Sequence, residues 1–529
     1  MPDVQHSASI EVTSSAEAVA AVLVAHIGAQ ARSAEVFEAP IPDDPTDDGS
    51  LVVTLTPTGP SSSTVEITAS SALRLPYFHG IVAMMVSSHY ERTTAWVCGV
   101  IEHELGDGPR VDRPKPSTLL PPVPFTSEQA VLLATAGFAL AVATFGQSII
   151  GQFAKSVSTS YSLSDHGISN VLSVLRIGAL VALFATTLAD RFGRRKVTLW
   201  SLYGLAAANL ASALAPDPTS FTVLQTIARG FSTAVLIVAA VAALEGAPER
   251  ARGYATSMLA LAGGAGFAVT VITFSFLGRV GWGWRAMFVL SAVSGLFVSR
   301  IASHLKESHR YERLVDADVA RGRVRAVFGR AYRRRFILLA LIAFLTNILA
   351  APSATLTNKY LSDARHYSDA TILLLRATTT TFPGLLGLVL AARFVEQYGR
   401  RSTAVVCLSF GAIARAVFFL CGGPLLWICS ALGDLLIACG SLAIGTQNIE
   451  LFPTETRGTS NGLVVVVGVM GSILGLQTVG VLSDPLGGLG PPLAICAAGT
   501  LLAAIAVVPF LPETNRLDLD DISPSSPTT

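Results

Sequence analysis

From residue 129 to residue 511 the sequence alternates between long apolar runs and short polar segments. Each run holds about twenty residues with few charges, which is the length a helix needs to cross about 30 Å of hydrocarbon. Glycine and proline inside the runs do not argue against helices, because membrane helices tolerate both. The pattern predicts twelve membrane-spanning helices, at 129–154, 167–188, 197–215, 219–244, 254–277, 285–303, 336–357, 368–392, 402–422, 424–448, 459–482 and 491–511.

The first 105 residues follow a different pattern. The stretch "SIEVTSS" alternates between apolar and polar positions like a β-strand, and Ser14 or Ser15 is a candidate N-cap for a helix that continues to about Gln30. "SLVVTLTPTG" and "SSTVEITAS" alternate like the two strands of a hairpin. These residues are therefore predicted to form a small α+β domain outside the membrane.

One apolar stretch after Pro76 is ambiguous. It begins "YFHGIVAMMV" and is long enough for a thirteenth span, but His79, His89, Glu91 and Arg92 would be costly in lipid. Apolar residues recur there at steps of three or four, which predicts a long helix that packs one face on the sheet. The order of strand, helix, strands and long helix resembles the helix-grip fold of polyketide cyclase and START-like domains. A solid core is the default expectation, and the resemblance implies a cavity for an apolar ligand as the alternative. A protein partner of residues 1–105 is a further alternative.

A nine-residue pattern occurs twice in the membrane portion. "EGAPERARG" at 245–253 and "ELFPTETRG" at 450–458 share the form ExxPxxxRG at an offset of 205 residues. Two further pairs have an offset of 206 residues: "DRFGRR" (190–195) with "EQYGRR" (396–401), and "KES" (306–308) with "PET" (512–514). Three markers in one register predict that the membrane portion is a duplication of two six-helix bundles.

The predicted organisation follows from these patterns. It consists of a cytoplasmic α+β domain (1–105), a Pro-rich linker (106–127), an N-terminal six-helix bundle (128–303), a basic inter-bundle segment (304–335), a C-terminal six-helix bundle (336–514) and a disordered tail (515–529).

Composition and charge placement narrow the class of protein. The chain is 51% hydrophobic and only 14% charged, and its net charge of +1 indicates no nucleic-acid partner. Lys and Arg gather in the loops on the side of the N-terminus, with ten between residues 304 and 335. By the positive-inside rule both termini are cytoplasmic, in a multi-pass protein of the cytoplasmic (inner) membrane. The six cysteines form no CxxC pair and are predicted to be buried thiols, so neither a metal nor a cofactor is expected.

The repeated motifs resemble the major facilitator superfamily over about four hundred residues. "DRFGRR" is similar to the superfamily's loop signature GxxxDRxGRR, while "ELFPTETRG", the Trp284–Arg285 pair and the closing "PETN" are similar to its sugar-porter and metabolite-proton-symporter branches. The resemblance implies an all-α membrane fold of two six-helix bundles, with spans one, four, seven and ten around a central cavity.

Several positions depart from the superfamily's pattern. Thr186 replaces the first glycine of the signature, and Glu396 with Gln397 replaces Asp-Arg in the second copy. The first span lacks the acidic residue of many proton-coupled members, and Gln147 is the nearest polar residue. "GGAGF" in the fifth span lacks the Gly-Pro step of drug antiporters, and close helix packing explains its glycines.

Carboxylates and guanidiniums cluster at the predicted cytoplasmic face. We hypothesise that they form a latch that favours the outward-open state, because such pairs can form in one conformation and separate in another. Static bracing of the loops is the alternative. The residues of this cytoplasmic gate network are Asp190, Arg191, Gly193, Arg194, Arg195, Glu245, Arg252, Glu396, Gly399, Arg400, Arg401, Glu450 and Arg457.

Ionisable residues inside the spans are functional candidates, because they are costly in a membrane. Arg229 in span four and Asp434 in span ten are 205 residues apart and so occupy equivalent positions in the two halves. The resemblance implies that they face one another across the substrate pathway. Arg229 is a candidate for binding an anionic group, and Asp434 for carrying a proton. Alternatively the two neutralise each other as a gate or structural pair.

Further polar residues lie within the spans. Arg176 and Arg376 are mid-span cations, and the excess of cations over acids favours an anionic or strongly polar solute. Arg415, in a span expected at the periphery, is predicted to bond helix carbonyls or to reach the membrane surface. Gln147 and Asn347 could donate hydrogen bonds to the solute.

These observations predict a secondary active transporter that moves a small polar or anionic organic solute by alternating access. Proton-coupled symport is favoured, with the proton gradient as the energy source and the monomer as the working unit. An efflux antiporter, facilitated diffusion, and a membrane sensor or lipid-handling protein acting through residues 1–105 are the alternatives. No GxSxG, HExxH, P-loop or dinucleotide motif supports an enzyme.

Overall fold

The computed structural model describes most of the chain between Val4 and Thr514. Residues outside the description are 1–3, 43, 45, 47–48, 60, 72–74, 107, 114–119, 122, 249–250, 278–279, 306–329, 453 and 515–529, together with the side chains of residues 181–187, 190–191, 252–253, 275, 330–331, 385, 388–389, 391–393, 395–396, 446, 449–450, 454–459 and 461. The tail at 515–529, which the sequence predicts to be disordered, and most of the inter-bundle segment therefore lie outside the described residues.

The described residues divide into two compact units. The first contains residues 1–140, 239–263 and 299–311, and the second contains 141–238, 264–298 and 312–529. The first unit thus joins the N-terminal domain to the adjoining ends of several membrane helices. The second unit holds the larger part of both six-helix bundles.

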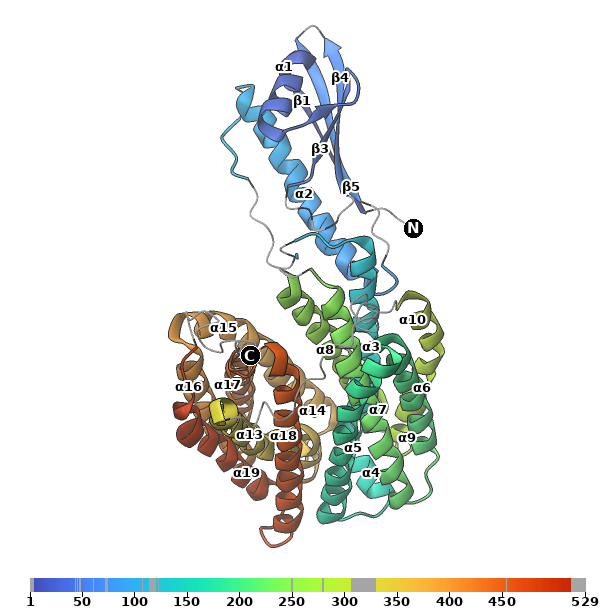
Figure 1. Cartoon of the computed structure of the whole chain (residues 1–529), viewed down its shortest axis with the longest axis vertical. Coiled ribbons are helices and arrows are strands. Elements are labelled where there is room, and N and C mark those ends of the chain that lie inside the picture. The colour runs from blue at the N-terminus through green and yellow to red at the C-terminus, as the bar shows by residue number, and fades with distance from the viewer. Residues whose placement is uncertain are drawn as a thin grey trace. The chain divides into compact units, whose positions relative to one another are not determined.

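The N-terminal domain is built on a five-stranded antiparallel sheet (Figure 1). Its strands, in the order in which they lie, are β1 (Val4–Val12), β5 (Ser62–Ser71), β4 (Ser50–Gly59), β3 (Val36–Pro40) and β2 (Gln30–Ala31). β4 and β5 form the predicted hairpin, with Val53 opposite Ile67. Alternate residues of β4, such as Leu51, Val53 and Leu55, are buried because successive side chains point to opposite faces.

Two helices cover this sheet. α1 (Ala16–Val22) begins where Ser15 caps it, with the Ser15 hydroxyl accepting a hydrogen bond from the backbone N–H of Ala18 at 3.4 Å. A π-helical turn, η1 (Leu23–Ile27), extends α1 to Gly28, whose φ of 70° ends it. The helix predicted from Ser14 or Ser15 to about Gln30 is therefore confirmed, with its end at Ile27.

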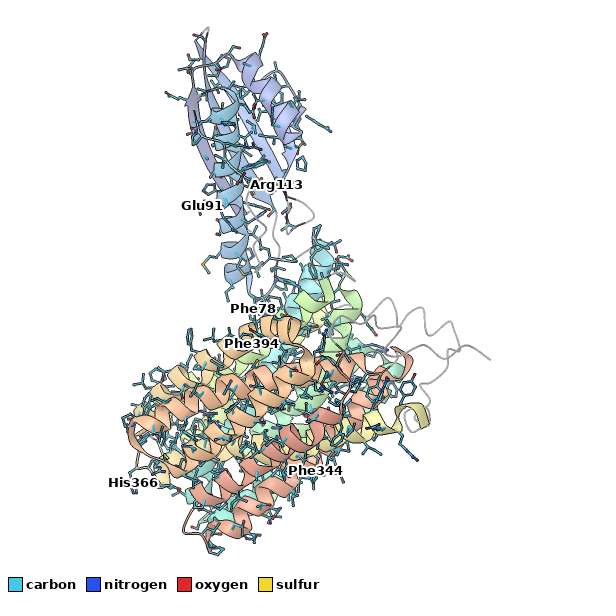
Figure 2. All side chains as sticks on the ribbon, turned by 90° about the vertical axis from the view of Figure 1, so that its left-hand side faces the viewer. Phe78, Glu91, Arg113, Phe344, His366 and Phe394 are labelled. Atoms are coloured by element: carbon cyan, nitrogen blue, oxygen red, sulfur yellow. The ribbon has the colours of Figure 1, made fainter. Side chains whose placement is uncertain are left out.

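The long helix α2 (His79–Glu104) packs along the sheet through one face, with Val86, Tyr90 and Ile101 buried. Phe78 lies just before its first turn and Glu91 lies near its middle (Figure 2). The small α+β domain is thus confirmed, while the helix-grip resemblance stays a prediction.

A buried polar group fixes the loop after β3 to α2. The Asp44 carboxylate accepts hydrogen bonds from the Thr46 backbone N–H at 3.0 Å, the Thr46 hydroxyl at 2.9 Å and the Tyr90 hydroxyl at 3.4 Å. Burial raises the pKa of the Asp44 carboxyl and raises the pKa of Tyr90 to about 12. The folded domain therefore favours the neutral form of both groups.

The membrane portion contains twelve successive helical segments among the described residues, in the predicted order. They are α3 (Ser127–Gln152), α5 (Asp165–Phe192), α6 (Arg194–Ala213), α7 (Pro218–Gly246), α8 (Arg252–Leu277), α9 (Gly283–Val293) continued by η3 (Ser294–Phe297) and α10 (Val298–His304), α13 (Arg330–Asp363), α14 (Asp369–Leu375) continued by η4 (Arg376–Thr381) and α15 (Phe382–Tyr398), α16 (Arg400–Leu420), α17 (Gly423–Glu450), α18 (Thr454–Ser483), and α19 (Gly490–Leu502) continued by η5 (Ala503–Val507) and η6 (Val508–Phe510). A short helix, α4 (Ala154–Ser160), follows α3. Within the described part of the chain, nine helices are long and apolar enough to cross a membrane.

Close contacts between helix backbones recur in the two halves. A Cβ added to Gly266 of α8 would lie 2.1 Å from the Ala141 carbonyl oxygen of α3, and one added to Gly471 of α18 would lie 2.1 Å from the Phe344 carbonyl oxygen of α13. The contact between span five (α8) and span one (α3) in the N-terminal half therefore has a counterpart between span eleven (α18) and span seven (α13) in the C-terminal half.

A second contact also repeats. Gly178 of α5 meets the Thr226 carbonyl oxygen of α7, and Gly387 of α15 meets the Leu435 carbonyl oxygen of α17, with an offset of 209 residues for both partners. Only glycine allows helices to approach this closely, so the same pair of spans packs through a glycine in both halves.

Candidate transport site

A cavity of about 470 Å³ lies within the C-terminal bundle. α13, η4, α16 and α17 supply most of its wall, with single residues from α18 and α19. Much of the wall is aliphatic, and the polar side chains include those of Asn347, Arg376, Thr380, Arg415 and Asp434. This volume falls within the range of small-molecule sites, roughly 300–1,000 Å³.

Asp434 and Arg415 form an ion pair in the wall of this cavity. The Arg415 Nη2 atom lies 3.1 Å from Asp434 Oδ1, and Nη1 donates to Asp434 Oδ2 at 3.4 Å. Arg415 Nε donates to the Ser353 hydroxyl at 3.1 Å, and its guanidinium lies 5.0 Å from the centre of the Phe418 ring. The arginine is thus held by a carboxylate, a hydroxyl and an aromatic face.

The position of Arg415 corrects two expectations. Arg415 is 4% exposed and pairs with Asp434 and Ser353, so the prediction that it bonds helix carbonyls or reaches the membrane surface is wrong. Asp434 pairs with Arg415 rather than with Arg229, so the idea of an Arg229–Asp434 neutralising pair is wrong as well. Gly433 provides the room, because a Cβ there would lie 3.3 Å from Arg415 Cδ. In the sequence, the signal for this close packing was Gly433 next to Asp434.

Arg376 is the second cation of the cavity. It begins η4, a π-helical turn inside span eight, and such turns are frequent at functional sites. Arg376 is 5% exposed, and within the described part of the chain its Nε and the Thr380 hydroxyl have no hydrogen-bond partner. The charges of Asp434 and Arg415 act on it. Two arginines and one aspartate give the cavity a net positive charge.

Arg229 of α7 and Arg176 of α5 lie on two helices of the N-terminal half that pack closely together. The charge that acts on Arg229 is that of Arg176, and Gly178 brings α5 so close that a Cβ there would lie 3.0 Å from Arg229 Cβ. Arg229 Nε is buried and has no partner among the described residues. Gln147 accepts a hydrogen bond from Ser232 at 2.9 Å, one turn beyond Arg229. That Arg229 and Asp434 face one another stays a prediction.

Asn347 lies in the cavity wall as a fixed polar group. Its Nδ2 donates to the Ala343 carbonyl at 2.8 Å, and its Oδ1 accepts from the Ser472 hydroxyl at 3.3 Å. The side chain therefore also helps to join α13 to α18, so its role includes packing between helices.

A set of charged residues joins the two bundles where α3 ends and α5 begins, which we call the far face. Lys359 Nζ of α13 lies 2.7 Å from Asp165 Oδ1 of α5 and 2.6 Å from Asp363 Oδ2. Lys155 Nζ of α4 lies 2.9 Å from Asp363 Oδ1. We did not predict this group from sequence, although Lys155 and Lys359, 204 residues apart, carry the signature of the repeat.

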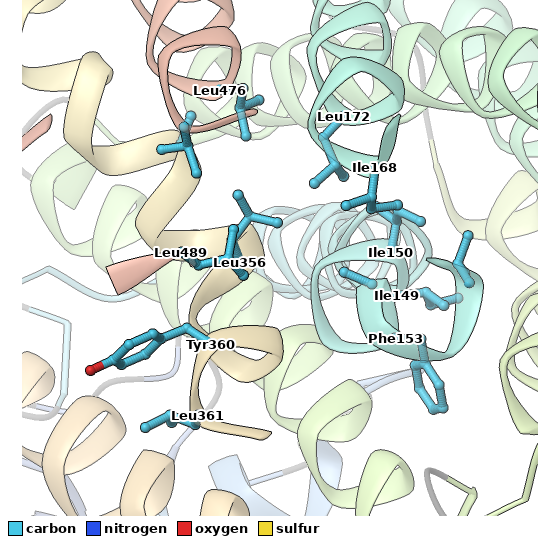
Figure 3. Close-up of a cluster of buried hydrophobic side chains, with 14 of the residues drawn as sticks. Ile149, Ile150, Phe153, Ile168, Leu172, Leu356, Tyr360, Leu361, Leu476 and Leu489 are labelled. Carbon is cyan, nitrogen blue, oxygen red and sulfur yellow. The ribbon is translucent and has the colours of Figure 1, made fainter. Parts of the chain in front are cut away.

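Apolar side chains from both bundles pack beside these charges (Figure 3). The N-terminal half contributes Ile149, Ile150, Phe153, Ile168 and Leu172, and the C-terminal half contributes Leu356, Tyr360, Leu361, Leu476 and Leu489. An amide pair, Asn358 Nδ2 to Gln152 Oε1 at 2.6 Å, lies in the same region. The far face is therefore closed in this conformation.

The opposite face, which we call the GRR face, carries the two repeated loops. Gly193 and Gly399 have φ values of 95° and 90°, a region that favours glycine. The Glu513 carboxylate of the "PET" marker accepts the backbone N–H groups of Arg400 at 2.9 Å and Arg401 at 3.0 Å. An acid at the first turn of α16 satisfies otherwise unpaired donors there. Glu513 is a capping residue that sequence reasoning did not assign.

Much of the predicted gate network cannot be compared with the structure. The side chains of Asp190, Arg191, Arg252, Glu396, Glu450 and Arg457 lie outside the described residues. Arg194 is buried, and its Nη1 donates to the Ala189 carbonyl at 3.4 Å, while Arg401 Nη1 donates to the Pro509 carbonyl at 3.3 Å. Glu245 is partly buried at the end of α7. The latch itself stays a prediction.

Two repeated six-helix bundles with buried charges around a cavity define a multi-pass membrane transporter. Sequence comparison identifies its family: the profile of the Major Facilitator Superfamily matches residues 136–375 and 350–523. The chain belongs to the Major Facilitator Superfamily. It is a solute transporter rather than an enzyme.

Several relatives are similar over most of the membrane portion. The chain is 25% identical to a probable 4-methylmuconolactone transporter of Cupriavidus pinatubonensis, covering 65% of this chain and 82% of the relative. It is 25% identical to the putative niacin/nicotinamide transporter NiaP of Bacillus subtilis (74% and 98% covered) and 22% identical to a gentisate transporter of Corynebacterium glutamicum (68% and 82% covered).

Solved structures share the fold. The inward-open xylose transporter XylE of E. coli aligns with a TM-score of 0.58 at 17% identity, covering 74% of this chain and 98% of that one. The nucleoside transporter NupG aligns with a TM-score of 0.58 at 13% identity, covering 71% and 99%.

Proposed function

We propose that this transporter moves a small organic anion across the cytoplasmic membrane by alternating access, in symport with a proton. The observation that carries the proposal is the cavity of the C-terminal bundle, in which the buried side chains of Arg376 and Arg415 outnumber the carboxylate of Asp434. A buried, uncompensated cation is costly, and a bound carboxylate would offset that cost.

The chemistry of the wall supports this class of solute. A carboxylate could accept from Arg376 Nε and from the Thr380 hydroxyl, both of which lack a partner within the described structure. The aliphatic residues around them suit the apolar part of the same molecule. The relatives are named for 4-methylmuconolactone, niacin or nicotinamide, and gentisate, which are all small organic molecules. Arg229 and Arg176 give the N-terminal half a matching positive charge.

Asp434 provides a means of proton coupling. When Asp434 is charged, it holds Arg415 in the ion pair. When Asp434 is protonated, the attraction is lost and Arg415 can bind the carboxylate of the solute instead. Proton and anion would then bind together, so that the loaded transporter has the same net charge as the empty one. This linkage replaces the acidic residue that the first span lacks.

The closed far face indicates toward which side of the membrane this conformation is open. With both termini in the cytoplasm, as the distribution of Lys and Arg favours, the GRR face is cytoplasmic and the far face is external. A far face sealed by Lys359, Asp165 and apolar packing then corresponds to an inward-facing state. The gate network on the GRR face would form the opposite closure.

Transport by purified protein in liposomes tests the proposal. Arg376→Gln is expected to reduce both counterflow and net uptake of a radiolabelled organic acid at least tenfold. Asp434→Asn is expected to keep counterflow and to lose uptake driven by an inward proton gradient, because exchange needs no net proton movement. Arg334→Gln, an exposed arginine at the beginning of α13, is the matched control.

The outcomes separate the alternatives. Uptake by Asp434→Asn that still follows the proton gradient would exclude Asp434 as the coupling residue. Accumulation driven by an outward proton gradient in the parent protein would favour antiport and efflux. Uptake of neutral sugars but not of acids would refute the anionic class of solute.

A further inference from the structure

The outward-facing stripe of α2 changes character along the helix. Near its beginning the exposed residues are Ile81 and Met84, with 58% and 66% of their surface accessible. One to two turns later the exposed residues are Ser88 and Glu91. The other face of α2 is buried from Val86 onward, and Val82 and Met85 are partly buried before it, whereas Ile81 and Met84 are apolar side chains that the domain itself does not cover.

The beginning of α2 lies against a membrane helix. The Tyr77 ring stacks on the ring of Phe138 in α3, with centroids 4.2 Å apart and planes 6° apart. A Cβ on Gly137 would lie 3.6 Å from the Phe78 ring. Phe138 comes about 16 Å along the axis of α3 from Ser127, at 1.5 Å per residue, in a helix that is apolar and long enough to span.

The two helices run in opposite directions. Figure 1 shows their courses: α2 begins where Tyr77 meets Phe138 and leads away from that point, whereas α3 runs toward it from Ser127. Ile81 and Met84 are therefore level with the first turns of α3, and Glu91 is level with the residues that precede it. The change from apolar to polar on α2 coincides with the beginning of the apolar run of span one.

The local backbone agrees with a specific contact at this point. Phe78 has a φ of 58°, a conformation that residues other than glycine rarely adopt. Its ring lies beside Gly137 of α3, where an added Cβ would be in van der Waals contact with the ring at 3.6 Å. A bulky aromatic residue in a left-handed turn, held by a membrane helix, indicates that the seating of the ring maintains the turn.

We propose that residues 77–85 are a membrane anchor, inserted in the leaflet on the side where α3 begins, with Ile81 and Met84 in contact with lipid acyl chains. The occupant of this apolar surface is the bilayer, because the surface continues directly from the membrane helix on which Tyr77 stacks. His89, Glu91 and Arg92 make α2 an unfavourable thirteenth span. The anchor is consistent with this, because only the first turns of α2, before these residues, enter the membrane. The N-terminal domain is then attached to span one in two ways, by the contact of Tyr77 with Phe138 and by its Pro-rich linker.

Site-directed spin labelling of the intact protein in liposomes tests the anchor. Nitroxides at Ile81→Cys and Met84→Cys are compared with nitroxides at Ser88→Cys and Glu91→Cys on the same stripe. Power saturation with oxygen, which partitions into lipid, and with a water-soluble nickel chelate reports the surroundings of each label. The parent protein labelled in parallel gives the background from the native cysteines.

The expected result is a change of environment between adjacent turns. Labels at 81 and 84 should collide mostly with oxygen, and labels at 88 and 91 mostly with the nickel chelate. Equal accessibility of all four labels to the chelate would overturn the proposal. Strong dipolar broadening between labels at 81 would also overturn it, because a second copy of the chain would then cover the surface. A loss of the oxygen preference in Phe78→Ala, with counterflow unchanged, would support the seating by span one.

Discussion

Removing Lys359 should open the far face. Lys359 connects the two bundles through Asp165, and its side chain is 9% exposed while that of Asp165 is 24% exposed. Lys359→Ala therefore deletes a largely buried ion pair between parts that must separate in the outward-facing state. It also leaves Asp165 and Asp363 without their shared cation, so their repulsion further favours separation.

The size of the effect follows from the contact. A hydrogen bond between charged groups contributes about 1.5–3 kcal/mol, and each 1.4 kcal/mol is a factor of ten in an equilibrium. The equilibrium between far-face-closed and far-face-open states should shift roughly ten- to hundredfold toward the open state. Lys155→Ala is the matched control: the Lys155 side chain is 48% exposed, and an exposed pair contributes about 1 kcal/mol or less.

Cysteine accessibility measures the shift. Ala350 lines the cavity and is exposed within it, so Ala350→Cys reports which face admits reagent. A membrane-impermeant maleimide applied from the far face should label Ala350→Cys at least ten times faster when Lys359→Ala is added, and at most about fivefold faster with Lys155→Ala. Asp165→Ala should give no large further increase in the Lys359→Ala background. Labelling from the far face at the parent rate in Lys359→Ala would refute the assignment of Lys359 as a lock.

Two further predictions concern other parts of the chain. Gly399→Ala should destabilise the protein by more than about 1 kcal/mol, because φ is 90° and the new Cβ would lie 2.7 Å from Glu513 Oε2. Gly264→Ala is the control and should not destabilise the protein, because the space around Gly264 is open. Thermal unfolding of the two variants measures the difference. Asp44→Asn should stabilise the N-terminal domain at pH 7 more than at pH 4. Burial raises the pKa of the Asp44 carboxyl, so the charged form weakens the fold as the pH rises through that pKa, and pulse proteolysis of the intact protein at both pH values would detect the difference. An equal effect at the two pH values would show that the charge of Asp44 is not responsible.

The charges of the cavity show why equivalent positions need not have equivalent partners. Arg229 and Asp434 match in the sequence repeat, yet Asp434 pairs with Arg415 of the neighbouring span, and Arg229 lies beside Arg176. Both halves keep a close glycine contact between the corresponding spans, at Gly178 and Gly387. The two halves therefore share a scaffold while their ionisable residues have diverged.

The sequence alone determined the number and order of the spans, the duplication and the small N-terminal domain. Length decides these features, because crossing hydrocarbon takes about twenty apolar residues whatever surrounds the helix. The repeated motifs fixed the register of the halves, and alternation in β4 and β5 fixed the hairpin. These signals are local, so they survive without any knowledge of neighbours.

Only the tertiary structure decided which face of each helix meets protein. Lipid and a packed helix interface are both apolar, so the pattern along a membrane helix does not reveal its rotation. For this reason the burial of Arg415, its pairing with Asp434 and the closure of the far face by Lys359 were not predicted. The same limit applied to α2, whose exposed apolar turns acquired a meaning only when Tyr77 was seen to stack on Phe138. Rotation and pairing depend on contacts between segments far apart in the chain, and those contacts exist only in the folded protein.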